Sequence, residues 1–340
     1  MVIFALAFAA ALAVTTEFIT IGLLPVLAHE FGVSLGEAGW LVSAFALSAA
    51  IAGPVLTLYL TRWRTCNVLA VSLLVFGLGN VVAALFPNFT VMIGVRLVQG
   101  ALLPPLFSLA SSSAAALADK GRGGRAIGQV NFGTVIGAVG AVPAGVALAE
   151  QFGWRAIFFG LGILAAMAAA LVMAALQRAS ASVMPPSQQA GILRRPRFLA
   201  HLTLSALLFG AMFASYSYIA AFLGSLLDIS GSDLALALSV FGLAGFAGNW
   251  VASRAVDRGP TLLTLAVTVF LVGALALISL SGGHKVATLI LIAVWGAAHT
   301  AAFVVCQVRV LFAAPDAPAF AASLNISVCN LGIAVGAALG

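Results

Sequence analysis

Long apolar runs dominate the chain, and each is about as long as the stretch of roughly 20 mostly apolar residues that a helix needs to cross a bilayer. The alternating pattern of a membrane β-barrel, with strands of about 10 residues, is absent. The sequence therefore predicts an all-α polytopic membrane protein. Eleven runs follow one another, at Val2–Ala28, Gly36–Leu60, Cys66–Phe86, Thr90–Leu117, Arg125–Ala149, Trp154–Gln177, Phe198–Leu227, Asp233–Val256, Thr261–Ser281, Val286–Phe312 and Ala317–Gly340.

The composition excludes a water-soluble enzyme. Hydrophobic residues make up 63% of the chain and charged residues 7%, whereas soluble domains carry about 25% charged residues. The sequence contains no HExxH, GxSxG or Walker A motif. The three cysteines, Cys66, Cys306 and Cys329, show no ligand spacing. We expect no enzymatic activity, no cofactor and no metal.

The basic residues gather on one side of the predicted spans. Only Arg155 and Lys285 lie on the opposite side, and Arg96 lies within a span. Since basic loops stay in the cytoplasm, the N-terminus is predicted to be cytoplasmic, in a bacterial inner (plasma) membrane. This asymmetry accounts for the net charge of +6 without a nucleic-acid partner. The twelve bases of the rich side are Arg62, Arg64, Lys120, Arg122, Arg125, Arg178, Arg194, Arg195, Arg197, Arg254, Arg258 and Arg309.

An internal repeat divides the chain. A shift of 199 residues places Asn131-Phe-Gly133-x-x-x-Gly137 on Asn330-Leu-Gly332-x-x-x-Gly336. Because the orientation of the spans is kept, the halves are predicted to be parallel repeats. The predicted parts are a six-helix half at 1–178, a cytoplasmic linker at 179–197 and a second half at 198–340. The same shift carries the sixth span past residue 340, so we expect a truncated chain, with a natural eleven-span variant as the alternative.

Two charged residues lie inside predicted spans, Glu17 and Arg96. A charge at this depth costs at least about 2.5–3.5 kcal/mol, so such residues usually face a cavity or pair with one another. The favoured interpretation is a proton relay, in which Glu17 gains and loses a proton as its access to water changes. The alternative is a static Glu–Arg pair, or side chains that reach the interface.

Other polar and aromatic residues inside the spans form a second set of candidates. A cavity for an organic solute is predicted from Gln99, Asn131, Phe213, Tyr216 and His299. Tyr216 corresponds to Glu17 in the repeat, since 17 plus 199 is 216. Each residue taken singly is more often an interhelical hydrogen bond or ordinary packing than a ligand contact.

Small residues recur along the fifth span. Gly133, Gly137, Gly140 and Ala144 follow the spacing i, i+4, i+7, i+11, and Pro143 and Gly145 lie near the end of the span. Such a face lets two helices approach closely. It is interpreted as a packing surface that also moves during function, with static packing as the simpler alternative.

Four stretches together resemble the major facilitator superfamily and, within it, the drug/proton antiporter-like group that includes bacterial sugar-efflux and nucleoside-efflux permeases. The resemblance covers essentially the whole chain. Its motifs are Thr15-Thr16-Glu17-Phe18 with Gly22-Leu23-Leu24-Pro25, Arg96-Leu-Val-Gln99-Gly100, the glycine face from Gly133 to Gly145, and Ser323-Leu-Asn325-Ile-Ser with Asn330-Leu-Gly332.

The resemblance implies a monomer in the lipid bilayer that exports a small organic solute in exchange for protons by alternating access. Glu17 would be the proton-coupling acid, and Arg96 would modulate it or contact the solute. A symporter, a uniporter and a non-transporting scaffold or receptor remain alternatives. Sugar, nucleoside, drug and amino-acid solutes all stay open.

A cytoplasmic gating loop is also implied by the resemblance. The family places an aspartate in the loop between spans two and three, whereas this chain reads Arg62-Trp63-Arg64 there without one. The corresponding loop of the second half keeps Asp257 and Arg258. Gating is therefore expected to involve Arg62, Arg64, Asp257 and Arg258.

Overall fold

The computed structural model describes residues 2–60, 63–117, 123–176, 190–256, 259–281, 284–314 and 318–340. Within these ranges every regular element is a helix. The elements are α1 (Val2–Phe31), α2 (Leu35–Leu60), α3 (Thr65–Leu85), α4 (Phe89–Leu117), α5 (Gly123–Leu176), the short 3-10 helix η2 (Ala190–Arg194), α6 (Pro196–Tyr216), α7 (Ile219–Leu227), α8 (Gly231–Ala255), α9 (Pro260–Leu280), α10 (Lys285–Ala313) and α11 (Pro318–Leu339). The predicted all-α class is confirmed.

Local sequence signals account for the tight connection between α1 and α2. Gly32 has φ +64, a backbone conformation that glycine adopts at little cost. Two residues later, the Ser34 backbone N–H and hydroxyl both donate to a Glu37 carboxylate oxygen at 2.8 Å, and the Glu37 N–H donates to Ser34 Oγ at 3.2 Å. This reciprocal capping box starts α2 and holds the turn at the membrane surface.

The longest element, α5, is two consecutive helices. Gly153 interrupts it with φ 75 and ψ 154, between the predicted spans Arg125–Ala149 and Trp154–Gln177. Nine helices of the described residues are long and apolar enough to cross a membrane, with α5 counted once, and Leu324–Leu339 adds a shorter apolar helix. The number of eleven spans stays a prediction.

The seventh predicted span, Phe198–Leu227, is not continuous. It ends as α6 at Tyr216 and resumes as α7 at Ile219, with Tyr218 at φ −110 and ψ 14. No glycine or proline stands at the break, so the sequence carried no signal for it. The Tyr218 hydroxyl donates to the Ala337 carbonyl of α11 at 2.6 Å, so the break coincides with a tertiary contact.

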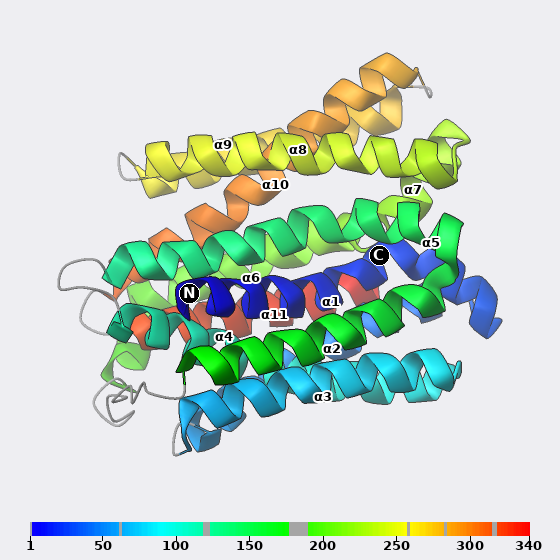
Figure 1. Cartoon of the computed structure of the whole chain (residues 1–340). Coiled ribbons are helices and arrows are strands. Elements are labelled where there is room, and N and C mark those ends of the chain that lie inside the picture. The colour runs from blue at the N-terminus through cyan, green and yellow to red at the C-terminus, as the bar shows by residue number, and fades with distance from the viewer. Residues whose placement is uncertain are drawn as a thin grey trace.

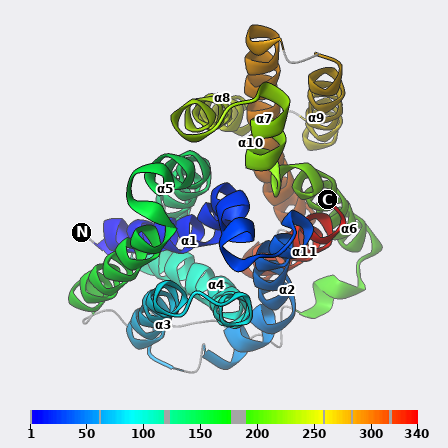
Figure 2. The same cartoon turned by 90° about the vertical axis from the view of Figure 1, so that its right-hand side faces the viewer.

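The helices form one bundle along a common direction (Figures 1 and 2). In the first part of the chain α1 packs on α5, α2 on α4 and α3 on α5; in the second part α6 packs on α11, α8 on α10 and α9 on α10. Contacts of α2 with α11 and of α5 with α8 join the two parts. These two pairs form most of the surface between the groups, and smaller contacts of α1 with α7 and of α4 with α11 complete it.

The close helix contacts repeat at a fixed offset. A Cβ atom on Gly133 or Gly137 of α5 would collide with the carbonyl oxygen of Ala7 or Ala11 of α1. On α11, Gly332 and Gly336 meet the carbonyl oxygens of Ala206 and Gly210 of α6 in the same way. All four positions are related by 199 residues, so the repeat in the sequence is also a repeat of backbone contacts.

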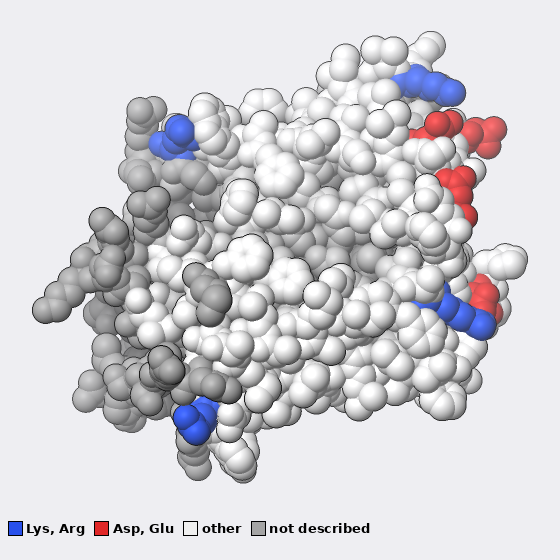
Figure 3. All heavy atoms as spheres, viewed as in Figure 1, with Lys and Arg blue, Asp and Glu red and all other residues white. Residues whose placement is uncertain are grey.

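On the face of the bundle that Figure 3 shows, the charged side chains of the described residues lie at the two ends. In Figure 3 the coloured residues stand at both ends, the acidic ones at the right-hand end, and the surface between them is white. A charge-free band of this kind suits the hydrocarbon core of a bilayer. The end that holds the connection between α1 and α2 is called the α1–α2 end below.

Candidate functional site

Arg96 of α4 joins three helices. Its side chain is fully buried. Nε donates to the Leu41 carbonyl of α2 at 3.0 Å, and the two terminal nitrogens donate to the Thr16 and Glu17 carbonyls of α1 at 2.9 and 3.0 Å. The guanidinium carbon lies 4.2 Å from the centre of the Phe45 ring, a cation–π contact. The cation is therefore held by backbone dipoles and an aromatic face.

Glu17 contacts the Arg96 guanidinium through its backbone carbonyl and not through its carboxylate. Its side chain is 8% exposed, and among the described residues no hydrogen bond or ion pair to its carboxylate is present. The alternative interpretation, a static pair of Glu17 with Arg96, is thus not observed: Arg96 donates to the Glu17 carbonyl instead. The carboxylate is a nearly buried acid that does not share an ion pair with its neighbouring cation.

Aromatic side chains from α6, α8 and α10, in the second group of helices, form a cluster. His299 of α10 lies with its ring centre 4.4 Å from that of Tyr216 and 5.6 Å from that of Phe213, both on α6. Phe241 of α8 packs on Tyr216 at 5.3 Å. Phe18, next to Glu17, contacts Phe213 and Tyr216 at 5.9 and 6.2 Å. The predicted residues Phe213, Tyr216 and His299 therefore lie together, and α1 adds Phe18, the residue after Glu17, to their edge.

Two buried nitrogen atoms in and beside this cluster have no hydrogen-bond partner in the described part of the chain. The His299 Nδ1 and Trp295 Nε1 atoms are buried and have no hydrogen-bond partner among the described residues. Trp295 packs on Phe241 with ring centres 5.3 Å apart. Buried polar atoms without partners cost free energy, and a bound solute with polar groups would satisfy them.

Of the two other cavity candidates, only Gln99 has a described side chain, and it contacts α3. Gln99 donates to the Phe76 carbonyl at 3.1 Å and to Asn80 Oδ1 at 2.9 Å, both on α3, so the structure does not bring it to the aromatic cluster. The prediction treated a polar residue in α4 as facing the solute, although such a residue also serves to bind α3. The Asn131 side chain lies outside the described residues.

The small residues of α5 that contact α1 are not all the predicted ones. Gly133 and Gly137 meet α1 as described above, and a Cβ on Gly145 would lie 3.0 Å from Ile19 Cγ1. Gly140 is exposed and has nothing within 4 Å of such an atom, and Pro143 is half-buried. The structure therefore leaves Gly140 outside this contact.

The predicted gating loops are mostly not described. Arg62, Asp257 and Arg258 lie outside the described residues. Arg64 is exposed and precedes the first residue of α3 at the helix N-cap position.

A second buried cation, Arg309, was not identified in the sequence analysis. Arg309 counts there as a loop residue, but it lies in α10 and is 2% exposed. One terminal nitrogen donates to Ser205 Oγ at 3.1 Å and the other to Thr264 Oγ1 at 3.4 Å. Its position inside the apolar run Val286–Phe312 is the signal that could have identified it.

The described residues offer no metal site: no group of three or more His, Cys, Asp or Glu in these ranges could hold a metal ion. What they assemble is a nearly buried acid and a cation fixed to backbone carbonyls in the first group of helices, and an aromatic cluster to which both groups contribute. Such an arrangement is suited to moving a solute and a charge.

Comparisons with known proteins agree with this arrangement. The inner membrane transport protein YdhP of Escherichia coli O157:H7 is 31% identical over 327 residues, covering 96% of this chain and 84% of that protein. The chloramphenicol resistance protein of Streptomyces lividans is 34% identical over 328 residues, covering 95% and 83%. A solved structure of a bacterial homologue of the human lysosomal transporter Spinster, inward-facing and occupied, matches with a TM-score of 0.79 at 17% identity, covering 99% and 80%.

A family model extends the match along almost the whole chain. The model of the Major Facilitator Superfamily matches residues 6–337. The relatives are membrane transport proteins, and the chain has the same fold as solved transporters. The protein is therefore a multi-pass membrane transporter of small solutes and a member of the major facilitator superfamily.

Proposed function

We propose that the protein exports a small organic solute in exchange for protons. Glu17 is the proton-coupling acid of this proposal. The single observation that carries it is the environment of Glu17: a carboxyl group that is 8% exposed, has no ion pair among the described residues and belongs to the residue before Phe18, whose ring packs on the second group of helices. The relative from Streptomyces lividans is a chloramphenicol resistance protein, and resistance to a drug favours export as the direction of transport.

Arg96 has a positioning role in this proposal. Its hydrogen bonds to the Thr16 and Glu17 carbonyls tie α1 to α4, and its bond to the Leu41 carbonyl adds α2. A rigid connection of this kind makes Glu17 move together with the first group of helices. The cation also lowers the cost of a negative charge on the nearby carboxyl group.

The aromatic cluster is the proposed solute site. Phe213, Tyr216 and His299 supply flat apolar surfaces and an unused ring nitrogen, while Phe18 connects them to α1. Solute and proton would then meet at adjacent residues, Phe18 and Glu17. The solute is a sugar, a nucleoside, a drug or an amino acid. Chloramphenicol is the first probe, because the relative from Streptomyces lividans is a chloramphenicol resistance protein.

Alternating access would come from the two halves, 1–178 and 198–340, rocking about the central site, with the linker 179–197 and the N-terminus in the cytoplasm. The α2–α11 and α5–α8 contacts are the surfaces that would change. The glycine contacts within each half would hold it together as one body. A monomer suffices for this mechanism, because both halves belong to one chain.

The test is solute-driven proton movement in proteoliposomes that contain a pH indicator. A panel of solutes that begins with chloramphenicol identifies one that the protein carries. With this solute we expect proton movement against the direction of solute flow. The Glu17→Gln variant should still exchange solute for solute but should move no protons.

Glu37→Gln is the matched control, because glutamine also forms a capping box and Glu37 is exposed at the start of α2. This variant should keep both activities. Unchanged coupling in Glu17→Gln would remove that residue from the role, and proton movement in the same direction as the solute would replace antiport by symport.

A further inference from the structure

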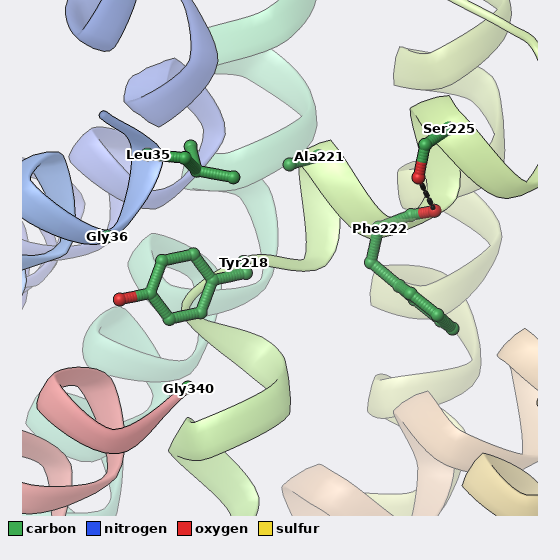
Figure 4. Close-up of a pocket in the computed structure, with 7 residues that line it drawn as sticks. All are labelled: Leu35, Gly36, Tyr218, Ala221, Phe222, Ser225 and Gly340. Carbon is green, nitrogen blue, oxygen red and sulfur yellow. Dashed lines mark hydrogen bonds between the residues drawn. The ribbon is translucent and has the colours of Figure 1, made fainter. Parts of the chain in front are cut away.

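A hollow opens at the α1–α2 end, where the two groups of helices meet. It has a volume of about 380 Å³ and is lined by Leu35 and Gly36 of α2, by Ala221, Phe222 and Ser225 of α7, by Tyr218 and by Gly340. Figure 4 shows the Tyr218 ring between Leu35 and Gly340, with its hydroxyl pointing away from Phe222 and Ser225. The Tyr218 ring therefore forms part of the hollow's wall, and its polar tip points out of the hollow.

Three small residues hold the tip of Tyr218. Its hydroxyl donates to the Ala337 carbonyl of α11 at 2.6 Å. A Cβ atom on Gly39 of α2 would collide with this hydroxyl, and one on Gly340 would lie 2.9 Å from the Tyr218 ring. Tyr218 and α11 belong to the second group of helices, whereas Gly39 belongs to the first. The phenol thus sits on the boundary that alternating access must open.

We propose that Tyr218 is the seal of the solute path at the α1–α2 end, closed by docking its hydroxyl against Gly39 of α2. The hollow above the ring is the part of the path already open to water. When α2 moves away from α11, the contact with Gly39 is lost and the path continues past the ring. The bond to Ala337 keeps the phenol with the second group of helices during this movement.

Gly39 is the residue on which the seal depends. It is buried, and only hydrogen at this position leaves room for the hydroxyl. Three residues earlier on the same helix, Gly36 lines the hollow and is exposed, and a Cβ atom added to it would have nothing within 4 Å. The helix therefore offers two glycines near each other, of which one has the tight contact and the other does not.

The break between α6 and α7 allows this placement. Tyr218 lies between the two helices with non-helical backbone angles. A continuous helix would carry its side chain in a direction set by the helical repeat. The break frees that direction, so the phenol reaches across to α11 and α2.

The seal is tested by the reactivity of a buried reporter thiol. Ser43 lies one turn beyond Gly39 on α2, is 1% exposed and has a hydroxyl without a partner among the described residues. Ser43→Cys is introduced after the native Cys66, Cys306 and Cys329 are replaced by alanine. The purified protein in detergent is then treated with a sulfonated maleimide, and the labelling rate is measured.

We expect Gly39→Ala to raise the labelling rate of the reporter at least fivefold, and Tyr218→Phe, which removes the bond to Ala337, to raise it at least twofold. Gly36→Ala should leave it unchanged. A second reporter, Ser113→Cys near the other end of α4, is also buried. Its labelling should not rise in any of these variants, because the effect is confined to the α1–α2 end.

Unchanged labelling in both Gly39→Ala and Tyr218→Phe overturns the proposal, and so does an equal rise in Gly36→Ala or at the Ser113→Cys reporter. If Gly39→Ala does not fold, Tyr218→Phe alone decides, since it removes a single oxygen atom. The inference rests on the proposed function only in requiring a solute path. Because the labelling needs neither solute nor proton gradient, it can fail while proton-coupled export stands, and the reverse also holds.

Discussion

Two guanidinium groups buried in the described helices donate to acceptors other than carboxylates, although Arg309 Nε has no partner among the described residues. Arg96 donates to three backbone carbonyls, and Arg309 donates to two hydroxyls, to the Cys306 thiol and to the His201 carbonyl. A charge in the membrane usually pairs with its opposite. Backbone carbonyls serve equally well as acceptors, and they leave the nearby acid, Glu17, available for a proton.

The first prediction concerns the geometry of Arg96. Arg96→Lys keeps the charge but places one ammonium on a flexible stem, which cannot donate to carbonyls on two helices as the planar fork does. Each hydrogen bond of the charged guanidinium that is lost costs about 1.5–3 kcal/mol. We expect the thermal midpoint of the purified protein to fall by at least 5 °C and the transport rate to fall at least tenfold.

Arg155→Lys is the matched control. Arg155 pairs with Glu30 at 2.6 Å on the surface, with side chains 51% and 35% exposed, and exposed pairs contribute about 0–1 kcal/mol. Its midpoint should stay within about 1 °C of the parent. Equal losses in the two variants would mean that the number of charges matters and the fork geometry does not.

At the scale of the helix, a row of small residues sets how α1 and α5 cross. The observed contacts involve Gly133, Gly137 and Gly145, and Ala141 between them is buried. This is a spacing of four residues, and Gly332, Gly336 and Gly340 repeat it on the shorter α11. Rows of this kind incline to the helix axis, so two helices that share one cross at an angle.

The sequence predicted small residues facing a neighbouring helix, and the structure has them. It could not decide between the spacings i, i+4, i+7 and i, i+4, i+8, because Gly140 and Ala141 are both small. That choice depends on the direction of the partner helix, which is a tertiary property. Gly140 consequently faces away from α1.

The second prediction separates these two positions. Gly137→Ala places a methyl group against the Ala11 carbonyl, so α1 and α5 must move apart. We expect the thermal midpoint to fall by several degrees, with transport reduced. In Gly140→Ala the added methyl group has no neighbour within 4 Å. Alanine is also a better helix former than glycine, by up to about 1 kcal/mol, so the thermal midpoint of this variant should stay the same or rise.

Gly336→Ala extends this test to the second half of the chain, where the methyl group would meet the Gly210 carbonyl of α6. Its midpoint should fall by about as much as that of Gly137→Ala. A fall in Gly140→Ala of the same size would show that any added methyl group on α5 is harmful, and the row would lose its special status.

At the scale of the whole molecule, the contacts repeat with two offsets. The pairs of α1 with α5 and of α6 with α11 are related by 199 residues. Gly100 against the Phe45 carbonyl and Gly296 against the Phe241 carbonyl are related by 196. The sequence reveals the first offset through a shared motif. The second is accompanied by a shorter shared motif, Ser43-x-Phe45-x-Leu47 on Ser239-x-Phe241-x-Leu243, which the sequence analysis did not identify.

The last prediction concerns the surface between the halves, where packing must be undone during transport. A Cβ on Gly242 of α8 would lie 2.9 Å from Val139 Cγ1 and 3.0 Å from the Val139 carbonyl oxygen of α5. Gly242→Ala therefore disfavours the arrangement in which α5 and α8 touch, while the contacts inside each half stay. We expect the transport rate to change about threefold to tenfold with a midpoint within about 2 °C of the parent.

Gly273→Ala on α9 is the control for this variant, because a Cβ there meets nothing within 4 Å and it should change neither quantity. The contrast with Gly137→Ala is decisive: a methyl group inside one half should cost stability, and one between the halves should alter the balance of conformations. If Gly242→Ala lowered the midpoint as far as Gly137→Ala does, α5 and α8 would belong to one static core. The moving surface would then have to lie at the other contacts between the halves, chiefly that of α2 with α11.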